Sequence, residues 1–158
     1  MKTIERTEYL NRIKNLKDTP DIKVITGIRR SGKSILMQEY IQYLKDNFND
    51  INVIFIDFMD LSFEHLKEYH ALHAYVEERY VEGKSNYLFI DEVQMCPNFE
   101  LAVNSLYSKR KYDIYITGSN AFLLSADLAT LFTGRYIEIH VYPFSFKDIV
   151  ITTTTTTT

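Results

Sequence analysis

The eight residues from Gly27 to Ser34 read G-I-R-R-S-G-K-S and match the pattern G-x-x-x-x-G-K-[ST] at every fixed position. Glycines in such a loop let the backbone turn so that successive N–H groups point inward at phosphate oxygens. The preceding segment, Ile22–Thr26, is short, β-branched and largely apolar, which predicts a buried strand. Apolar residues then recur at helical spacing over Lys33–Phe48, which predicts a helix whose N-terminus faces the phosphates. A strand, loop and helix in this order restrict the chain to an α/β fold.

Residue types within the loop suit individual roles. Lys33 supplies a mobile positive charge to the β- and γ-phosphates of a nucleotide, and the Ser34 hydroxyl is a ligand for Mg²⁺. Arg29 and Arg30 occupy variable positions, where we favour solvated side chains over a contact with phosphate. The candidate nucleotide-binding residues are therefore Gly27, Ile28, Arg29, Arg30, Ser31, Gly32, Lys33, Ser34 and Ile35.

The rest of the chain alternates between two periodicities. Short apolar runs predict strands at Ile51–Phe58, Tyr87–Ile90, Asp113–Thr117 and Tyr136–Tyr142. Helical spacing predicts helices at Thr7–Asp18, Ser62–Val81 (ended by Gly83), Phe99–Ser108 and Ala121–Leu131. Strands alternating with helices form βαβ units with right-handed crossovers. The expected architecture is a three-layer P-loop fold, with a parallel five-stranded sheet covered by helices on both faces.

Two carboxylates follow the third expected strand. Tyr87–Ile90 delivers Asp91 and Glu92 to the carboxyl end of that strand, which is the edge where ligands bind in open α/β sheets. Asp91 is a candidate ligand of magnesium, and Glu92 a candidate to orient and deprotonate an attacking water. Adjacent acids at a strand end also occur without any function, so the complete phosphate loop upstream decides the interpretation.

A short polar segment, Thr117–Asn120, ends the fourth expected strand at the same edge. Either Ser119 or Asn120 is a candidate sensor that contacts the γ-phosphate or holds the lytic water. The alternative is a turn in which Asn120 caps the next helix.

Composition narrows the class of partner. The formal net charge is −3 and the pI is near 5.8, so nucleic acid is not indicated as a partner. The single cysteine, Cys96, suits a packed thiol in a reducing, cytoplasmic compartment. The longest apolar runs are far too short to span a membrane. Thr152–Thr158 is an unbroken threonine run without a packing pattern, so we expect residues 1–150 to be one ATPase core and 151–158 to be a non-functional or artefactual tail.

Four motifs in order resemble a known family. The runs I-T-G-I-R-R-S-G-K-S, L-F-I-D-E-V-Q, I-T-G-S-N and L-F-T-G-R-Y-I-E-I look like those of the AAA-type predicted P-loop ATPases of archaea and bacteria, over nearly all of residues 4–150. The resemblance implies a sheet ordered 5-1-4-3-2, Glu92 as catalytic base, and a sensor at Ser119 or Asn120. It also implies an arginine finger at Arg135 for a neighbouring subunit, and hence a homo-oligomer. The alternative for Arg135 is a turn residue paired with an acid such as Glu138. Members of this family generally continue into further C-terminal domains, so we expect this chain to be part of a longer protein with an unknown protein partner.

Other P-loop classes fit less well. A GTPase usually has D-x-x-G after the third strand, where this chain reads D-E-V-Q, and no N-K-x-D guanine-binding motif follows. A small-molecule kinase usually carries an arginine-rich lid between the fourth and fifth strands, where this chain has only Arg135. The expected function is therefore binding of ATP with Mg²⁺ and its hydrolysis to ADP and phosphate. The alternative is a nucleotide-gated switch with little turnover.

Overall fold

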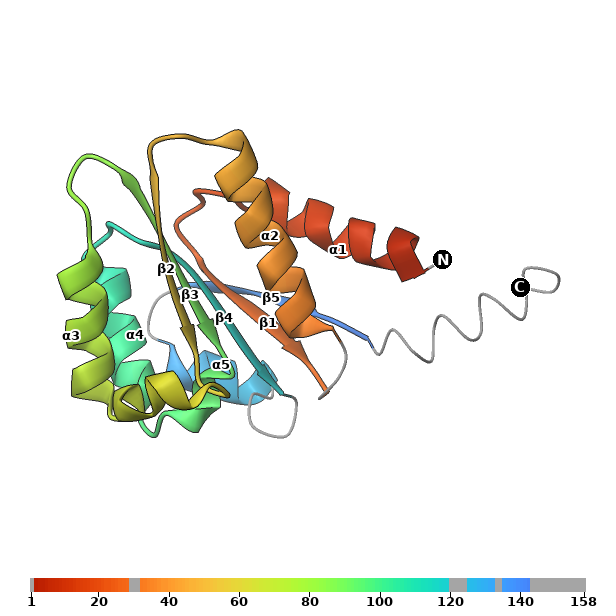
Figure 1. Ribbon diagram of the computed structural model, residues 1–158. Helices are drawn as coiled ribbons and strands as arrows, with labels where there is room; N and C mark the ends of the chain where they lie inside the picture. The colour runs from red at the N-terminus through yellow and green to blue at the C-terminus, as the bar shows by residue number, and fades with distance from the viewer. Residues whose placement is uncertain (1, 29–31, 120–124, 133–134, 143–158) are drawn as a thin grey trace, which may run out of the picture.

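The five strands form one parallel sheet (Figure 1). A computed structural model describes residues 2–28, 32–119, 125–132 and 135–142, without the side chains of 2–6 and 125–127. The strand order is β2-β3-β4-β1-β5, which confirms the expected order 5-1-4-3-2 read from the other edge. The strands are β1 (Ile22–Gly27), β2 (Ile51–Asp57), β3 (Ser85–Asp91), β4 (Asp113–Ser119) and β5 (Tyr136–His140).

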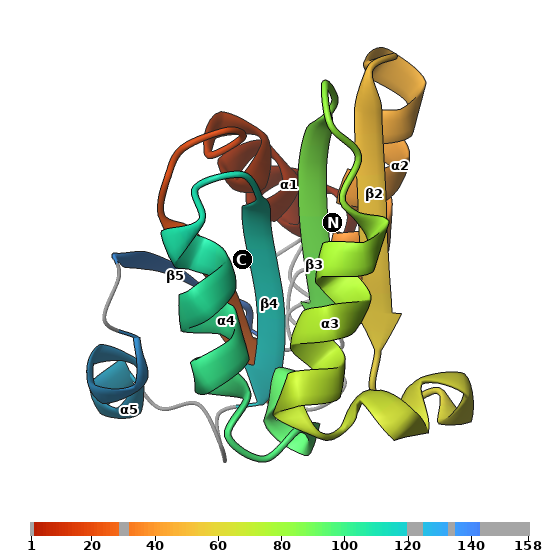
Figure 2. The same ribbon diagram turned by 90° about the vertical axis from the view of Figure 1, so that its left-hand side faces the viewer.

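Helices cover both faces of the sheet, so the three-layer α/β prediction is confirmed. Figure 1 shows α1 (Lys2–Asn15) and α2 (Lys33–Asn47) together on one face. Figure 2 shows α3 (Tyr69–Arg79) and α4 (Phe99–Ser108) side by side in front of the other face, with α5 (Ser125–Leu131) beyond α4. Two short 3₁₀ helices, η1 (Leu61–Leu66) and η2 (Val93–Met95), follow β2 and β3. Each face has its own apolar cluster, because the side chains of every strand alternate between the two faces.

Burial along the strands follows their place in the sheet. Every described residue of β1 and β4 is buried, as is all of β3 after Ser85. The edge strands β2 and β5 are only intermittently buried. The near-continuous apolar runs that identified the central strands in the sequence are those of strands covered on both faces.

One predicted helix is wrong in extent. Instead of a single helix over Ser62–Val81, the chain forms η1 and then α3, with an extended residue, Glu68, between them (φ −119°, ψ 128°). The Glu68 carboxylate accepts hydrogen bonds from the backbone N–H groups of His70 and Ala71, so it caps α3. The helix then ends at Arg79, and Gly83 lies in the turn that follows rather than at the helix end.

The other boundaries shift by a few residues. The first helix begins at Lys2 and ends at Asn15, earlier than predicted at both ends. β4 continues past Thr117 to Ser119, whereas β5 ends at His140 rather than Tyr142. The start of the expected helix Ala121–Leu131 lies partly outside the described residues, which show helix from Ser125.

Candidate functional site

The loop after β1 has the backbone that its glycines were predicted to permit. Gly27, the last residue of β1, has φ 155°, and Gly32, which precedes α2, is left-handed with φ 96° and ψ 10°. L-residues with a side chain rarely adopt either conformation, so these two positions require glycine. Helix α2 begins directly after Gly32, and its first N–H groups face the site. Arg29, Arg30 and Ser31 lie outside the described residues.

Lys33 joins the loop to the acidic strand end. Its side chain is only 3% exposed, and Nζ donates to the backbone carbonyls of Gly27 and Ile28, at 3.1 Å each. The same ammonium lies 4.0 Å from Oε2 of Glu92. The candidate phosphate-binding lysine and the candidate catalytic carboxylate, more than fifty residues apart in the chain, therefore meet in space.

Asp91 and Glu92 are both held by Thr117 of β4. The Asp91 side chain is buried, and its Oδ1 accepts a hydrogen bond from Oγ1 of Thr117 at 2.5 Å. The same hydroxyl oxygen accepts from the backbone N–H of Glu92 at 2.9 Å. This fully buried threonine fixes the end of β3 against β4, so it holds the Asp91 carboxylate and the backbone of Glu92 in place.

Glu92 is also oriented by its own backbone and by Gln94. Its φ is 56° and its ψ 55°, the left-handed conformation that is costly for a residue of this type. Its Oε1 accepts from Nε2 of Gln94 at 2.7 Å. The other amide atom of Gln94, Oε1, is buried without a hydrogen-bond partner in the described part of the chain.

Of the two sensor candidates, only Ser119 lies within the described residues. Ser119 is buried at the end of β4 and pairs in register with Gly27, the first residue of the phosphate loop. Asn120 lies outside the described residues. The position of Ser119 places a hydroxyl-bearing residue beside the loop.

Arg135 pairs with an acid, as the alternative to the arginine finger expected, but the acid is Asp21 rather than Glu138. Its Nε donates to Oδ1 of Asp21 at 3.1 Å, and its side chain is 78% exposed. Glu138 instead accepts from Oγ1 of Thr26 at 2.6 Å. Because Arg135 precedes β5, it lies at the amino edge of its own sheet, opposite the phosphate loop.

Sequence reasoning assigned no role to three residues at the carboxyl edge: Asp57, Thr117 and Gln94. Asp57 ends β2 and pairs in register with Asp91. Burial raises the pKa of the Asp57 carboxyl, and the nearby charges of Asp91 and Asp60 raise it further, against a hydrogen bond from the Met59 N–H. The repeat of I-F-I-D at the end of β2 and L-F-I-D at the end of β3 is the signal that could have identified Asp57.

The oxygen donors at this edge fit a magnesium ion. Mg²⁺ prefers carboxylate and hydroxyl oxygens and keeps several waters. The buried Asp91 carboxylate uses one oxygen for Thr117, and Ser34 is exposed in the first turn of α2. Cys96 takes no part in this chemistry, because burial raises the pKa of its thiol to about 11.

This fold and this combination of phosphate loop and acidic strand end define an AAA-type P-loop ATPase domain. A family model described as "AAA domain" matches residues 19–150, and the chain belongs to that family. Solved structures with the same fold include DnaA from Aquifex aeolicus with AMPPCP bound. It is 16% identical with a TM-score of 0.53, and the match covers 94% of this chain and 50% of that one. A second is Drosophila ORC bound to AT-rich DNA and Cdc6, 8% identical with a TM-score of 0.59, covering 90% of this chain and 56% of that one.

Curated relatives share more of the sequence. An uncharacterized protein of Haemophilus influenzae is 40% identical over 149 residues, which are 93% of this chain and 37% of that protein. An uncharacterized protein of Methanocaldococcus jannaschii is 30% identical over 148 residues, which are 92% of this chain and 32% of that protein. The chain thus spans about a third of the length of these relatives. Within the described residues, no helix has both the length and the apolar character needed to cross a membrane.

Proposed function

We propose that this domain binds ATP together with Mg²⁺ and hydrolyses it to ADP and phosphate. The observation that carries the proposal is the meeting of Lys33 and Glu92, whose charged atoms lie 4.0 Å apart. A phosphate group bound in the loop is then within reach of both a cation and a general base.

Binding is assigned to the loop and the start of α2. Backbone N–H groups of Gly27–Ser34 and the positive end of the helix surround the phosphates, and Lys33 interacts with the β- and γ-phosphates. Ile28 and Ile35 are both 49% exposed. Such apolar side chains beside the loop are available to contact the nucleoside. We include Arg29, Arg30 and Ser31 in the binding segment from the sequence pattern.

The oxygen ligands for the metal are assigned to Asp91 and Ser34. Asp91, through water, and the Ser34 hydroxyl would hold Mg²⁺. When bound, the ion neutralises charge that develops on the phosphate oxygens.

Glu92 carries the hydrolytic step. Its carboxylate accepts a proton from a water whose oxygen attacks the γ-phosphorus, while the bond from that phosphorus to the β–γ bridging oxygen breaks to release ADP. Lys33 stabilises negative charge on the transferred group. Ser119 or Asn120 contacts the γ-phosphate or positions the water.

Assembly would complete the site. We propose that Arg135 contacts the γ-phosphate of a neighbouring subunit in a homo-oligomer, because within one chain it lies at the edge opposite the loop. We take residues 1–150 as the ATPase core of a longer protein, with its protein partner bound elsewhere. The tail at 151–158 has no assigned role. The buried Cys96 suits a reducing cytoplasm.

Three variants test the proposal in the purified protein. In the unchanged protein, Mg·ATP at a hundred times its Kd is expected to add about 2.7 kcal/mol to the free energy of unfolding and so to raise the melting temperature. Lys33→Ala is expected to abolish this rise, because the variant lacks the cation that binds the phosphates. Glu92→Gln is expected to keep that rise but to slow hydrolysis roughly 100-fold or more, as for a lost general base. Asp91→Asn is expected to weaken only the Mg²⁺-dependent part of binding. An unchanged nucleotide-induced shift in Lys33→Ala protein, with its fold intact by circular dichroism, would remove the phosphate-loop assignment.

A slow nucleotide-gated switch is the second candidate. It is favoured by one observation: one Glu92 carboxylate oxygen already accepts a hydrogen bond from Gln94. A base held in this way must be released before it can act. The steady-state hydrolysis rate of Gln94→Ala protein decides between the two, because a faster rate than that of the unchanged protein identifies a restrained base.

A further inference from the structure

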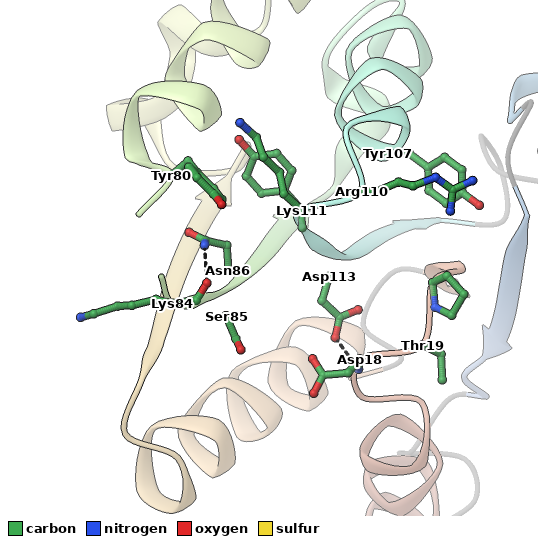
Figure 3. Close-up of a pocket in the computed structure, with 12 residues that line it drawn as sticks. Asp18, Thr19, Tyr80, Lys84, Ser85, Asn86, Tyr107, Arg110, Lys111 and Asp113 are labelled. Carbon is green, nitrogen blue, oxygen red and sulfur yellow. Dashed lines mark hydrogen bonds between the residues drawn. The ribbon is translucent and has the colours of Figure 1, made fainter. Parts of the chain in front are cut away.

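A second concave site lies at the opposite edge of the sheet, at the amino ends of the strands. It is a cavity of about 540 Å³, within the range of roughly 300–1,000 Å³ that is typical of small-ligand sites. Three connecting segments form it, as Figure 3 shows. Its lining residues are Asp18–Pro20 before β1, Tyr80 and Lys84–Asn86 before and at the start of β3, and Tyr107 with Arg110–Asp113 between α4 and the start of β4.

The cavity arises from the register of the sheet. β4 begins at Asp113, which pairs with Tyr87, whereas β3 already begins at Ser85. The start of β4 is therefore recessed, and Asp113 lies at the base of the recess. Its Oδ1 accepts from Lys23 at 2.6 Å, and its Oδ2 accepts from the backbone N–H of Asp18 at 2.8 Å, the bond drawn in Figure 3. The base of the cavity is fixed by these bonds before any ligand binds.

Two cations on its walls have no partner. Within the described part of the chain, the Lys84 ammonium and the Arg110 guanidinium make no hydrogen bond or ion pair, and Figure 3 shows them on opposite sides of the cavity. The lining residues and their ion-pair partners together include five cations and three carboxylates, although the whole chain carries a formal charge of −3. These are Lys17, Lys23, Lys84, Arg110 and Lys111 against Asp18, Glu77 and Asp113. The cavity is a local concentration of positive charge.

Tyrosine rings stand between these cations. Tyr80, Tyr107 and Tyr112 line the cavity and are each partly exposed. The rings of Tyr80 and Tyr112 meet edge to face at 5.7 Å, and the Lys111 ammonium lies 4.2 Å from the centre of the Tyr80 ring. Aromatic faces beside cations suit a ligand that combines a planar ring with an anion.

Arg110 has a strained, left-handed backbone conformation, which suggests a role for its side chain in ligand binding. Four described non-glycine residues have positive φ: Asp18, Glu92, Asn98 and Arg110. Asp and Asn tolerate this conformation through local hydrogen bonds, but Glu and Arg do not. Glu92 is the candidate base of the ATP site, and Arg110, with φ 55°, follows the C-cap of α4 where glycine is the favoured residue. The strain at Arg110 places an unpaired guanidinium on the wall of the cavity.

We propose that this amino-edge cavity binds a nucleoside phosphate, either free or as one unit of a single-stranded nucleic acid. The phosphate contacts Arg110 and the base stacks on the tyrosine rings, while Lys84, on the opposite side of the cavity, contacts the phosphate of a neighbouring unit of the strand. The site is separate from the ATP site and does not depend on its assignment.

The test measures fluorescence anisotropy of a short fluorescein-labelled oligothymidylate over a series of salt concentrations. Each phosphate contact to a single strand contributes about 0.7 to the slope of log K against log [salt]. Lys84→Ala with Arg110→Ala is therefore expected to lower that slope by about 1.4. Tyr107→Leu is expected to weaken binding at least about 5-fold, because it removes a stacking ring while keeping an apolar side chain. Lys45→Ala, which removes an exposed lysine of α2 outside the cavity, is the matched control and is expected to change neither value.

Competition identifies the source of the ligand. Displacement of the label by free dTMP supports a mononucleotide site, whereas displacement only by unlabelled oligothymidylate supports a single-stranded nucleic acid. Equal displacement by inorganic phosphate or by polyglutamate overturns the proposal, because charge alone would then explain binding. The absence of binding, or equal binding by the double variant and the Lys45→Ala control, overturns it too. Lys33→Ala protein is expected to bind the label as tightly as unchanged protein, so a loss there would assign binding to the phosphate loop instead.

Discussion

Replacing Lys23 with methionine is expected to lower the free energy of unfolding by about 3–5 kcal/mol, the usual cost of removing one partner of a buried ion pair. Lys23 is fully buried, and its ammonium donates to the Asp113 carboxylate at 2.6 Å and to the Thr19 carbonyl. Methionine fills a similar volume but leaves the Asp113 charge buried with only the Tyr115 hydroxyl and one backbone N–H as donors. For a domain of this size the melting temperature should fall by roughly 10 °C.

The assay is urea unfolding followed by far-ultraviolet circular dichroism. Lys17→Met is the matched control, because the Lys17–Asp18 pair is partly exposed and such pairs contribute about 1 kcal/mol or less. Adding Asp113→Asn to Lys23→Met is expected to recover part of the loss, since the amide oxygen still accepts hydrogen bonds but carries no charge. If Lys23→Met costs no more than Lys17→Met, the buried pair does not hold the sheet in the way described.

The loss should also depend on pH. Burial raises the pKa of Asp113, and Lys23 opposes that rise. Without Lys23 the pKa in the folded state is higher still, above that in the unfolded chain. A carboxyl shifted upward stabilises the fold at pH values below its unfolded pKa and loses that contribution as pH rises through its folded pKa. The difference in stability between the two proteins should therefore be smaller at low pH than at neutral pH. A difference that grows as the pH falls would contradict this account.

Three further predictions concern the two sites. Thr117→Val is expected to slow ATP hydrolysis more than it weakens nucleotide binding, because it removes the hydroxyl that holds Asp91. Equal effects on kcat and KM would show that the threonine is purely structural. Arg135→Ala and Glu92→Gln proteins are each expected to be inactive, and mixtures of the two should recover activity if a finger worth ~10³-fold acts between subunits. Recovery should be absent if the protein hydrolyses ATP as a monomer. Arg110→Gly is expected to raise the free energy of unfolding by about 1 kcal/mol through relief of its left-handed backbone, while weakening oligothymidylate binding. A destabilised glycine variant would show that the arginine side chain holds the fold.

The sequence carried enough information for the class of fold, because that class follows from local patterns. Central strands are apolar along their whole length when both faces are covered, so the single sequence is enough to predict β1, β3 and β4. The glycines at positions 27 and 32 likewise identify their own backbone conformation. The sequence pattern did not predict the break at Glu68, because glutamate is not among the residues that usually cap helices. The apolar pattern also continues across this residue.

The site was predictable in its parts and not in its connections. Lys33, Asp91 and Glu92 were identified from residue type and strand position, but Thr117 was not given its role. Its hydroxyl reaches Asp91 only because β3 and β4 align in one register, and register is set by the packing of the whole sheet. The same limit applies to Arg135, whose partner Asp21 is distant in sequence and adjacent only after β1 and β5 pair.

The buried pair of Lys23 and Asp113 has a consequence for how the sheet assembles. Lys23 of β1 pairs in register with Tyr115 of β4, and the same alignment sets Gly27 beside Ser119 four residues further on. If β4 slid along β1, the ammonium and the carboxylate would separate inside an apolar core, where each unpaired charge is expensive. The ion pair at the amino end of β1 therefore destabilises misaligned sheets. The alignment that it favours places the phosphate loop beside Ser119 at the carboxyl end.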